Sequence, residues 1–258
     1  MWRKRYPVIQ SKHLNRPDSE PANIYALVEA LSSRLSEDQV TVVGNGSACV
    51  AGGHAYIIKK GQRFISNSAI ASMGYDLPAG IGACMAVHDP EFEGDGMSSH
   101  DLIVLTGDGS IQMNLQELQT IITNKLPIKI FLINNNGYHS IRLTQNNLFK
   151  EHCKVGIGPE SQDLSFPEFK RIAEAFGYKY YSASSNEEMK KTVDEVLKED
   201  GPLFCEIFTD TKQVWEPKSS TKRLEDGTLV SPPLEDLAPF LPREELKEIM
   251  FIPLIDEK

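Results

Sequence analysis

Two polar stretches that follow apolar runs contain the residues best suited to do chemistry in this chain. Asp108 lies just after the apolar run 102–105, and Asn135 lies just after the run 128–133. A carboxylate and a carboxamide oxygen, 27 positions apart (135 − 108 = 27), are hard oxygen ligands of the kind that Mg²⁺ takes. The metal would complete its coordination with water and phosphate oxygens. These residue types therefore suggest a magnesium site.

Small residues beside Asp108 would let an anionic group approach the backbone. Gly107 and Gly109 carry no side chain, and Ser110 together with the amino end of the following helix offers hydrogen-bond donors to a diphosphate. By itself, Gly-Asp-Gly is typical of an ordinary turn. The phosphate interpretation therefore depends on the second strand end, where Asn135 lies.

Two neighbouring parallel strands must position these side chains. Apolar residues recur at helical spacing between 111 and 124, so the sequence predicts a strand, a loop, a helix and a second strand. The carboxyl ends of parallel strands lie at one edge of a sheet, and ligands of open parallel sheets bind there. Asp108 and Asn135 are therefore expected to meet at that edge.

The rest of the chain repeats this alternation. Further helices are predicted at 23–35, 166–176 and 186–197, further strands at 40–43, 178–181 and 203–208, and another helix with Pro78 in its first turn. The expected fold is α/β, a three-layer sandwich in which a mostly parallel sheet of about five or six strands is flanked by helices.

The sequence predicts three regions. Residues 1–20 form a lead-in or linker, 21–208 one domain, and 209–258 an extended tail rich in proline and charge. The tail is expected to lie over a surface through its apolar residues Trp215, Leu229, Leu234, Phe240 and Leu241. The acidic segment 88–100 is predicted as a surface loop, and its own Gly-Asp-Gly follows no apolar run, so it is not a site candidate.

The composition is that of an ordinary globular protein, with 40% hydrophobic and 24% charged residues in a chain of 258. The net charge is −9, and basic residues form no stripe beyond Arg3-Lys4-Arg5, so no nucleic-acid partner is expected. Apolar runs of signal-peptide or membrane-spanning length are absent from the sequence, so we expect no membrane partner and a cytoplasmic location. The cysteines fit neither a disulfide framework nor paired zinc ligands and are predicted as core thiols: Cys49, Cys84, Cys153 and Cys205.

A nicotinamide-binding Rossmann site is disfavoured. The glycine-rich turn 44–47 follows the strand predicted at 40–43, but the dinucleotide fingerprint needs a glycine where Cys49 stands. The same test fails after Gly107, because position 112 is Gln112. Both turns remain candidates for binding phosphate.

The whole pattern resembles a known family. Gly-Asp-Gly at a strand end, followed after about two dozen residues by Asn-Asn at the next strand end, resembles the diphosphate and metal motif of thiamine diphosphate-dependent enzymes. The stretch Met73-Gly74-Tyr75-Asp76-Leu77-Pro78 is similar to the Met-Gly-(Tyr/Phe)-x-Leu-Pro block of the acetolactate synthase group. The resemblance covers roughly residues 20 to 220 and corresponds to the carboxyl-terminal, diphosphate-binding domain of such an enzyme.

The resemblance implies thiamine diphosphate and Mg²⁺ as cofactors. The side chains of Asp108 and Asn135 and the backbone carbonyl of Gly137 would hold the metal. The cofactor would contact Gly46, Ser47, Ala48, Ala71, Met73, Gly107, Asp108, Gly109, Ser110, Asn135, Gly137 and Ile141.

Three of the implied positions have distinct roles, and His139 is considered beside them. In the resembled group, a bulky residue at the position of Met73 wedges the cofactor into a bent shape, and the carbonyl at the position of Ala71 accepts a hydrogen bond from the aminopyrimidine. Ile141 would provide an apolar contact to the rings. His139 is a candidate catalytic residue, since a neutral imidazole can relay protons near pH 7. The alternative for His139 is a place on the surface of the helix start.

The resemblance also implies a reaction and partners. The reaction is decarboxylation of a 2-oxo acid, followed by protonation or by carboligation to an acceptor carbonyl. The glutamate that activates the cofactor in this group belongs to a pyrimidine-binding domain, and neither Glu117 nor Glu151 matches it. The expected partners are the 2-oxo acid and a homodimer or higher oligomer, a chain carrying the pyrimidine-binding domain, or both. Two alternatives remain: a subunit of a two-chain 2-oxo acid decarboxylase, and a non-catalytic cofactor-binding remnant.

Overall fold

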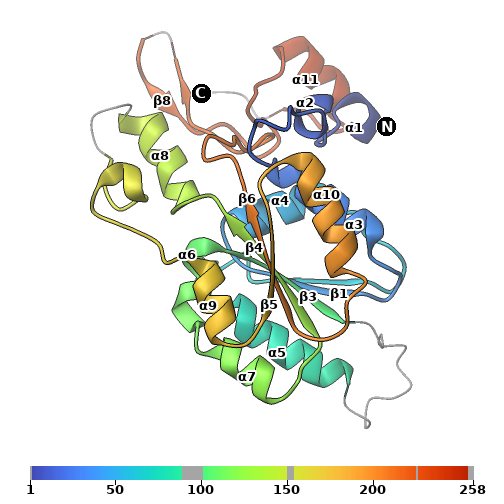
Figure 1. Ribbon diagram of the computed structural model, residues 1–258. Helices are drawn as coiled ribbons and strands as arrows, with labels where there is room; N and C mark the ends of the chain where they lie inside the picture. Colours follow the sequence, from blue (N-terminus) through green and yellow to red (C-terminus); the bar gives the residue numbers. More distant parts are fainter. Residues whose placement is uncertain (1, 89–100, 150–153, 225, 255–258) are drawn as a thin grey trace. The chain divides into compact units, whose positions relative to one another are not determined.

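The computed structural model describes residues 2–88, 101–149, 154–224 and 226–254 (Figure 1). The chain divides into two compact units. The larger unit is Ile9–Gln213, and the smaller one combines Met1–Val8 with Val214–Lys258. The parallel sheet and the candidate site both belong to the larger unit.

The larger unit is built on a six-stranded sheet whose strands are all parallel, in the order β2-β1-β3-β4-β6-β5. The strands are β1 (Val40–Val43), β2 (Arg63–Ser66), β3 (Leu102–Gly107), β4 (Ile128–Asn134), β5 (Lys179–Ala183) and β6 (Leu203–Phe208). The main helices are α3 (Ile24–Arg34), α4 (Ser47–Ala55), α5 (Asp76–Val87), α7 (Glu117–Thr123), α8 (His139–Phe149), α9 (Phe169–Ala175) and α10 (Asn186–Val196). Shorter helices are α2 (Ser11–Leu14), α6 (Asp108–Ile111), η2 (Gln112–Asn114) and η3 (Pro159–Ser161).

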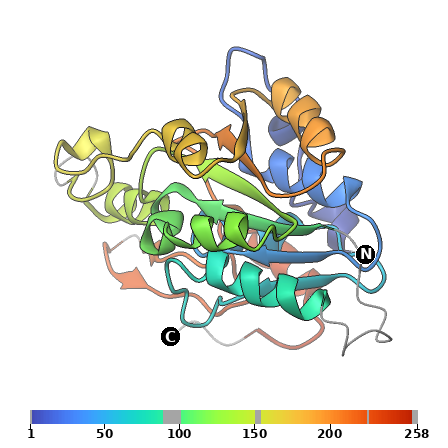
Figure 2. The ribbon, with the colours of Figure 1, turned by 60° about the horizontal axis from the view of Figure 1, so that its bottom comes forward.

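Helices cover both faces of the sheet, which confirms the predicted three-layer α/β sandwich. Helices α5, α7 and α9 lie on one face and α3, α4 and α10 on the other (Figures 1 and 2). Every second residue of the central strands points toward the layer formed by α5, α7 and α9. Val104 and Ile130 belong to one hydrophobic cluster there with Leu118 of α7. Helix α5 comes especially close to β3, because a Cβ atom added at Gly80 would lie 2.5 Å from Val104 Cγ2.

The strand register brings three loops to one edge. Val43 of β1 pairs with Leu105 of β3, and Gly107 of β3 pairs with Ile133 of β4. From β1 the chain crosses through α4 to β2, on one side of the neighbouring pair β1 and β3. From β3 it crosses through α7 to β4, on the opposite side of that pair. Such a reversal between neighbouring strands opens a crevice at their carboxyl ends.

Several elements differ from the sequence-based prediction. Strand β2 was not predicted, because it is an edge strand whose residues are exposed or half-buried and show no apolar run. Helix α4 was also missed, since its sequence SACVAGGHA contains two glycines and little periodicity. The loop expected after β3 is already helical from Asp108, and the single helix predicted at 111–124 is divided into α6, η2 and α7.

The smaller unit contains more regular structure than an extended tail. It includes α1 (Trp2–Arg5), α11 (Arg243–Ile249) and the antiparallel pair β7 (Lys222–Arg223) and β8 (Leu229–Val230). Arg5 forms ion pairs with Glu245 and Glu248, which attach the first helix to the last one. Trp215 is buried, whereas Leu229 and Leu234 are 53% and 81% exposed.

The remaining predictions concern single residues and segments. Cys84 and Cys205 are buried free thiols, Cys49 is half-buried, and Cys153 lies outside the described residues. The loop predicted at 88–100 lies outside them too, except for His88. Within the described ranges, no helix is both long and apolar enough to cross a membrane.

Candidate functional site

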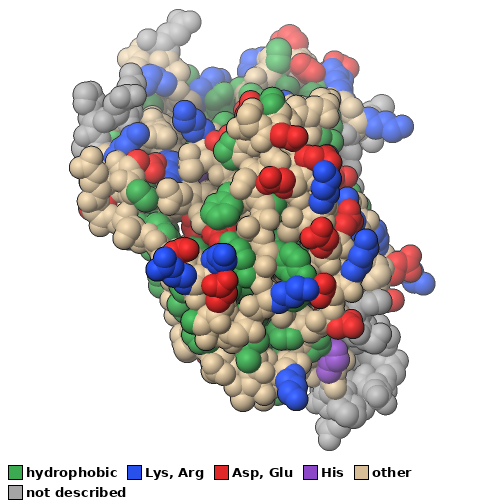
Figure 3. Space-filling model, in the orientation of Figure 1, with side chains coloured by type: hydrophobic (Ala, Val, Ile, Leu, Met, Phe, Trp, Pro, Cys, Tyr) green, Lys and Arg blue, Asp and Glu red, His purple; other side chains and the backbone are tan. Residues whose placement is uncertain are grey.

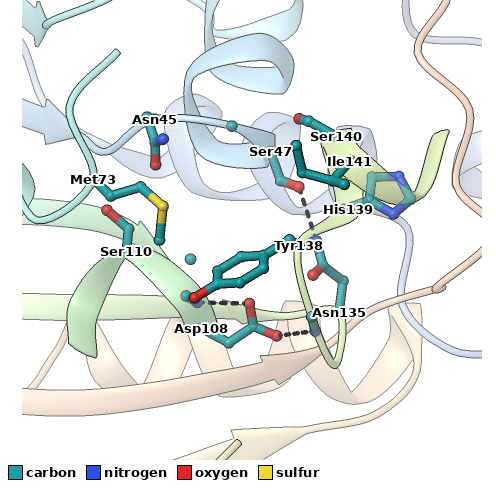
Figure 4. Close-up of a pocket in the computed structure, with 14 residues that line it drawn as sticks. Asn45, Ser47, Met73, Asp108, Ser110, Asn135, Tyr138, His139, Ser140 and Ile141 are labelled. Atoms are coloured by element: carbon teal, nitrogen blue, oxygen red, sulfur yellow. Dashed lines mark hydrogen bonds between the residues drawn. The ribbon is translucent and has the colours of Figure 1, made fainter. Parts of the chain in front are cut away.

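A pocket of about 240 Å³ opens where the loops after β1, β3 and β4 converge (Figure 4). Its lining residues are Asn45, Gly46, Ser47, Met73, Gly107, Asp108, Gly109, Ser110, Asn135, Gly137, Tyr138, His139, Ser140 and Ile141. The structure therefore brings together ten of the twelve residues predicted to contact a cofactor. The exceptions are Ala48, which is buried in α4, and Ala71.

Asp108 lies at the start of α6 with 2% of its surface exposed. Its Oδ1 accepts a hydrogen bond from the Gly109 amide at 2.8 Å, and its Oδ2 accepts one from the Gly137 amide at 2.9 Å. Burial raises the pKa of Asp108 to about 6, although the two amides and the positive charge of Arg142 oppose this rise. A divalent cation would offset the cost of burying this carboxylate in its charged form.

Asn135 provides the second polar group at the base of the pocket. Its side chain is buried, and its Nδ2 donates to Ser47 Oγ at 2.8 Å, which connects the loops after β4 and β1. Among the residues that the structure describes, its Oδ1 is buried without a hydrogen-bond partner. An unsatisfied buried acceptor is unusual and costly, and it is a suitable ligand for a cation.

The donor set therefore fits magnesium better than a softer metal. Asp108 supplies a carboxylate and Asn135 an amide oxygen, and Gly137 joins them through its hydrogen bond to Asp108. Among the residues that the structure describes, no three His, Cys, Asp or Glu side chains gather as a metal site. Hard oxygen donors with few protein ligands are typical of Mg²⁺ bound together with phosphate.

Gly109, directly after Asp108, is required by close packing. A Cβ atom added at Gly109 would lie 2.4 Å from Tyr138 Cε1, so the tyrosine ring covers the place of a side chain. Gly46 has a φ of 59°, in the left-handed region that favours glycine, and it directly precedes α4. The nine-residue α4 thus begins at the pocket, where its free amides can meet an anion.

Ser110 and Asp76 form a second buried cluster below the pocket. Ser110 Oγ accepts from the Gly74 amide at 2.9 Å, and its hydroxyl donates to Asp76. The Asp76 carboxylate also accepts from Thr106 Oγ1, and burial raises its pKa. The Ser110 hydroxyl therefore lines the pocket and is also engaged inside the protein, and its contact with a diphosphate stays a prediction.

The apolar residues of the predicted site lie at the pocket mouth. Met73 and Ile141 both line the pocket, and their side chains are 36% and 49% exposed. Ala71 adopts a φ of 54°, and its carbonyl accepts a hydrogen bond from Asn45 Nδ2 at 3.1 Å. The contact of this carbonyl with an aminopyrimidine ring stays a prediction.

His139 is held by hydrogen bonds on both sides of its ring. Its Nε2 lies 2.7 Å from the carbonyl oxygen of Gln213, and its Nδ1 lies 3.4 Å from Arg142 Nη1. Burial lowers the pKa of His139 to about 4, so the ring is neutral at pH 7, with the proton on Nε2. This arrangement favours a structural role, while the catalytic role suggested by the sequence stays a prediction.

Sequence reasoning missed two residues around the site. Asn45 lines the pocket, as do Tyr138 and Ser140, and Arg142 is buried behind it. The position of Asn45 in the glycine-rich turn was the available signal for it. No sequence pattern distinguishes Arg142 from an ordinary exposed arginine on a helix.

Comparison with known proteins agrees with this geometry. Residues 44–207 match the family described as thiamine pyrophosphate enzyme, C-terminal TPP binding domain. The acetolactate synthase large subunit of Porphyra purpurea is 32% identical over 213 residues, which cover 80% of this chain and 32% of the relative. The acetolactate synthase isozyme 2 large subunit of Escherichia coli (strain K12) is 28% identical over 217 residues, which cover 83% of this chain and 37% of the relative.

The match defines which part of such enzymes the chain corresponds to. The chain spans about a third of the length of these curated relatives. The family match covers more than half of the chain. It includes all three loops of the pocket, because the lining residues, from Asn45 to Ile141, fall within 44–207. This chain therefore belongs to the family of carboxyl-terminal TPP-binding domains of thiamine pyrophosphate enzymes.

Proposed function

We propose that the chain binds thiamine diphosphate and Mg²⁺ in this pocket, as the diphosphate-binding part of an acetolactate synthase-like enzyme. The enzyme would decarboxylate a 2-oxo acid and join the remaining fragment to an acceptor carbonyl. The observation that carries the proposal is the unpartnered Oδ1 of buried Asn135 at the pocket that Asp108 also lines. Family membership and the similarity to acetolactate synthase large subunits support it.

The residues of this chain would bind and orient the cofactor. Asp108, Asn135 and the carbonyl of Gly137 would hold the metal, and the amides at the start of α4 would meet the diphosphate. Met73 and Ile141 would contact the rings. When bound, thiamine diphosphate supplies the electron sink that the loss of carbon dioxide requires.

Exposed apolar side chains near the pocket support a partner in the proposed enzyme. Ile70 is 79% exposed and Met113 is 49% exposed, in addition to Ile141 at the pocket mouth. Such residues are candidates for burial against a second copy or a chain that carries the pyrimidine-binding domain. Glu117 begins α7 and Glu151 lies outside the described residues, so neither is proposed as the activating glutamate.

We propose that the protein is cytoplasmic and that it binds neither nucleic acid nor a membrane. The face seen in Figure 3 carries interspersed acidic and basic side chains, and the chain has a net charge of −9. A surface that binds the phosphate backbone of a nucleic acid carries clustered basic side chains instead. Among the described residues, Cys49, Cys84 and Cys205 are free thiols, which would suit a reducing compartment.

Isothermal titration of the chain with thiamine diphosphate, with and without Mg²⁺, tests the proposal. We expect binding to require Mg²⁺, and Asp108→Asn to weaken it at least about tenfold because the site loses a full charge. Asp194→Asn is the matched control, since Asp194 is an exposed carboxylate on α10 that pairs with Arg34. Equal affinity of Asp108→Asn and the native chain would contradict the metal assignment.

Product analysis separates the alternatives. With pyruvate and the completed enzyme, carboligation gives a condensed product such as acetolactate, whereas a two-chain decarboxylase releases only the aldehyde. Absence of metal-dependent cofactor binding would instead support a non-catalytic remnant.

A further inference from the structure

Arg142 lies in the second turn of α8 with only 3% of its surface exposed. Its guanidinium group reaches back to the loop that follows β4. Nη1 donates to the carbonyl oxygen of Asn135 at 3.2 Å, and Nη2 donates to that of Asn136 at 2.9 Å. The arginine thus contacts two consecutive carbonyls in the segment that contains the proposed metal ligands.

Glu160, in the 3₁₀ helix η3, fixes the guanidinium group from the other side. Arg142 Nε donates to Glu160 Oε1 at 2.5 Å, and Arg142 Nη2 donates to Oε2 at 3.1 Å. The hydrogen bonds to Arg142 hold the pKa of Glu160 below its usual range. A paired contact of this kind sets the orientation of the guanidinium plane as well as its position.

The loop that Arg142 contacts has a conformation that needs support. Asn136 has a φ of 54° and Gly137 a φ of 142°, both in regions that side-chain-bearing residues rarely adopt. The Gly137 amide donates to Asp108, and the Tyr138 amide donates to the carbonyl of Ile157 at 2.9 Å. A Cβ atom added at Gly137 would lie 1.9 Å from that carbonyl oxygen, so the loop is tightly enclosed.

We propose that Arg142, oriented by Glu160, is a positioning residue for the metal site. It holds the carbonyls of residues 135 and 136 and thereby keeps the side chain of Asn135 and the backbone of Gly137 in place for a divalent cation. It touches neither the cation nor the substrate. The metal part of this inference rests on the proposed function, whereas the effect on the loop is a property of the chain alone.

The first experiment follows amide hydrogen exchange by NMR in the chain without cofactor. In Arg142→Gln, the amides of Gly137 and Tyr138 should exchange at least about tenfold faster, because the loop loses its two carbonyl contacts. Arg34→Gln is the control, since Arg34 forms a comparable ion pair with Asp194 elsewhere in the same unit. Unchanged protection of both amides in Arg142→Gln would overturn the proposal.

The second experiment measures Mn²⁺ affinity by electron paramagnetic resonance in the presence of thiamine diphosphate. We expect Arg142→Gln to weaken Mn²⁺ binding about 10- to 100-fold, the usual effect of losing a group that orients metal ligands. Arg142→Lys keeps the charge but cannot contact both carbonyls and Glu160 together, so it should not restore the affinity. Full restoration by lysine would overturn the geometric role.

A third variant guards against loss of folding. Glu160 is partly exposed, and Glu160→Gln should weaken Mn²⁺ binding in the same direction but less, while the fold is retained. Native affinity in Glu160→Gln, in a folded sample, would contradict the role of the ion pair. If the native chain itself bound no Mn²⁺, the proposed function would fail, and the exchange rates would still decide whether Arg142 holds the loop.

Discussion

Asp108 and Asn135 illustrate how burial can prepare single residues for a cation. Removal from water raises the pKa of the Asp108 carboxyl, and the side-chain oxygen of Asn135 has no hydrogen-bond partner in the described part of the chain. Both features reduce the stability of the chain without a ligand. A divalent cation would offset both costs, so cofactor binding is expected to stabilise the fold.

The pKa of Asp108 gives a pH dependence of stability with a definite sign. The carboxyl titrates near pH 6 in the folded chain but near 3.8 when unfolded, so folding is favoured at low pH and loses this contribution as pH rises through 6. The difference corresponds to roughly 3 kcal/mol. Without Mg²⁺, the stability of Asp108→Asn relative to the native chain should therefore rise by up to that amount between about pH 4 and pH 7. Urea unfolding at several pH values measures this, and a difference that does not change with pH would contradict it.

Met73 offers a second prediction at the residue scale. Because its side chain is 36% exposed, Met73→Ala should cost less than about 2 kcal/mol of folding free energy. Turnover of the completed enzyme should fall more strongly, since the cofactor loses its alignment. Met189→Ala is the control, because Met189 is fully buried in α10 and its loss should cost about 2–5 kcal/mol. Thermal melts and turnover of one sample distinguish the two roles, and a stability loss equal to that of Met189→Ala would make Met73 an ordinary core residue.

At the scale of elements, the close approach of α5 to β3 positions the start of α5 and the segment before it. The contact at Gly80 explains how small residues in this helix allow it to lie directly on the sheet. Asp76, the first residue of α5, accepts a hydrogen bond from Thr106 of β3, two residues before Asp108. Packing of one helix therefore affects the loop on which Met73 lies and the strand that ends at Asp108.

Two glycines of α5 provide a matched test of this packing. Gly80→Ala should lower the free energy of unfolding by about 1–3 kcal/mol, because the new methyl group overlaps Val104. Gly82→Ala should raise it by about 0.5–1 kcal/mol, because no atom of the described residues lies within 4 Å of the new Cβ and alanine favours the helix. Denaturant unfolding of both variants checks the pair. Equal effects of the two substitutions would show that α5 is not packed as closely as described.

At the scale of the whole molecule, we expect the chain alone not to be a competent enzyme. It spans about a third of the length of its relatives, and apolar side chains such as Ile70 are exposed. Purified chain with thiamine diphosphate, Mg²⁺ and pyruvate should release negligible carbon dioxide. Activity should appear only when a chain carrying the pyrimidine-binding domain is added. Robust turnover by the chain alone, with mass spectrometry excluding a full-length contaminant, would disprove this expectation.

The sequence by itself determined four of the six strands of the sheet and the places where those four end. Apolar runs predicted β1, β3, β4 and β6 within one or two residues, and the helical periodicity of α3 and α10 was equally clear. These patterns are local, because burial on both faces of a parallel strand demands a continuous apolar run. The polar residues after β3 and β4 could be assigned to one edge of the sheet, because parallel strands run in the same direction and their carboxyl ends lie at the same edge.

Only the tertiary structure decided which polar groups are satisfied and which remain for a ligand. The hydroxyl of Ser110 is engaged by Asp76, His139 is held by Gln213, and Arg142 is buried against two carbonyls. The contacts of Ser110 and His139 join segments that are distant in the chain. The contact of Arg142 joins a helix to the loop that precedes it. The spacing of residues in a sequence carries no information about such pairings, because hydrogen bonding and burial depend on packing in three dimensions.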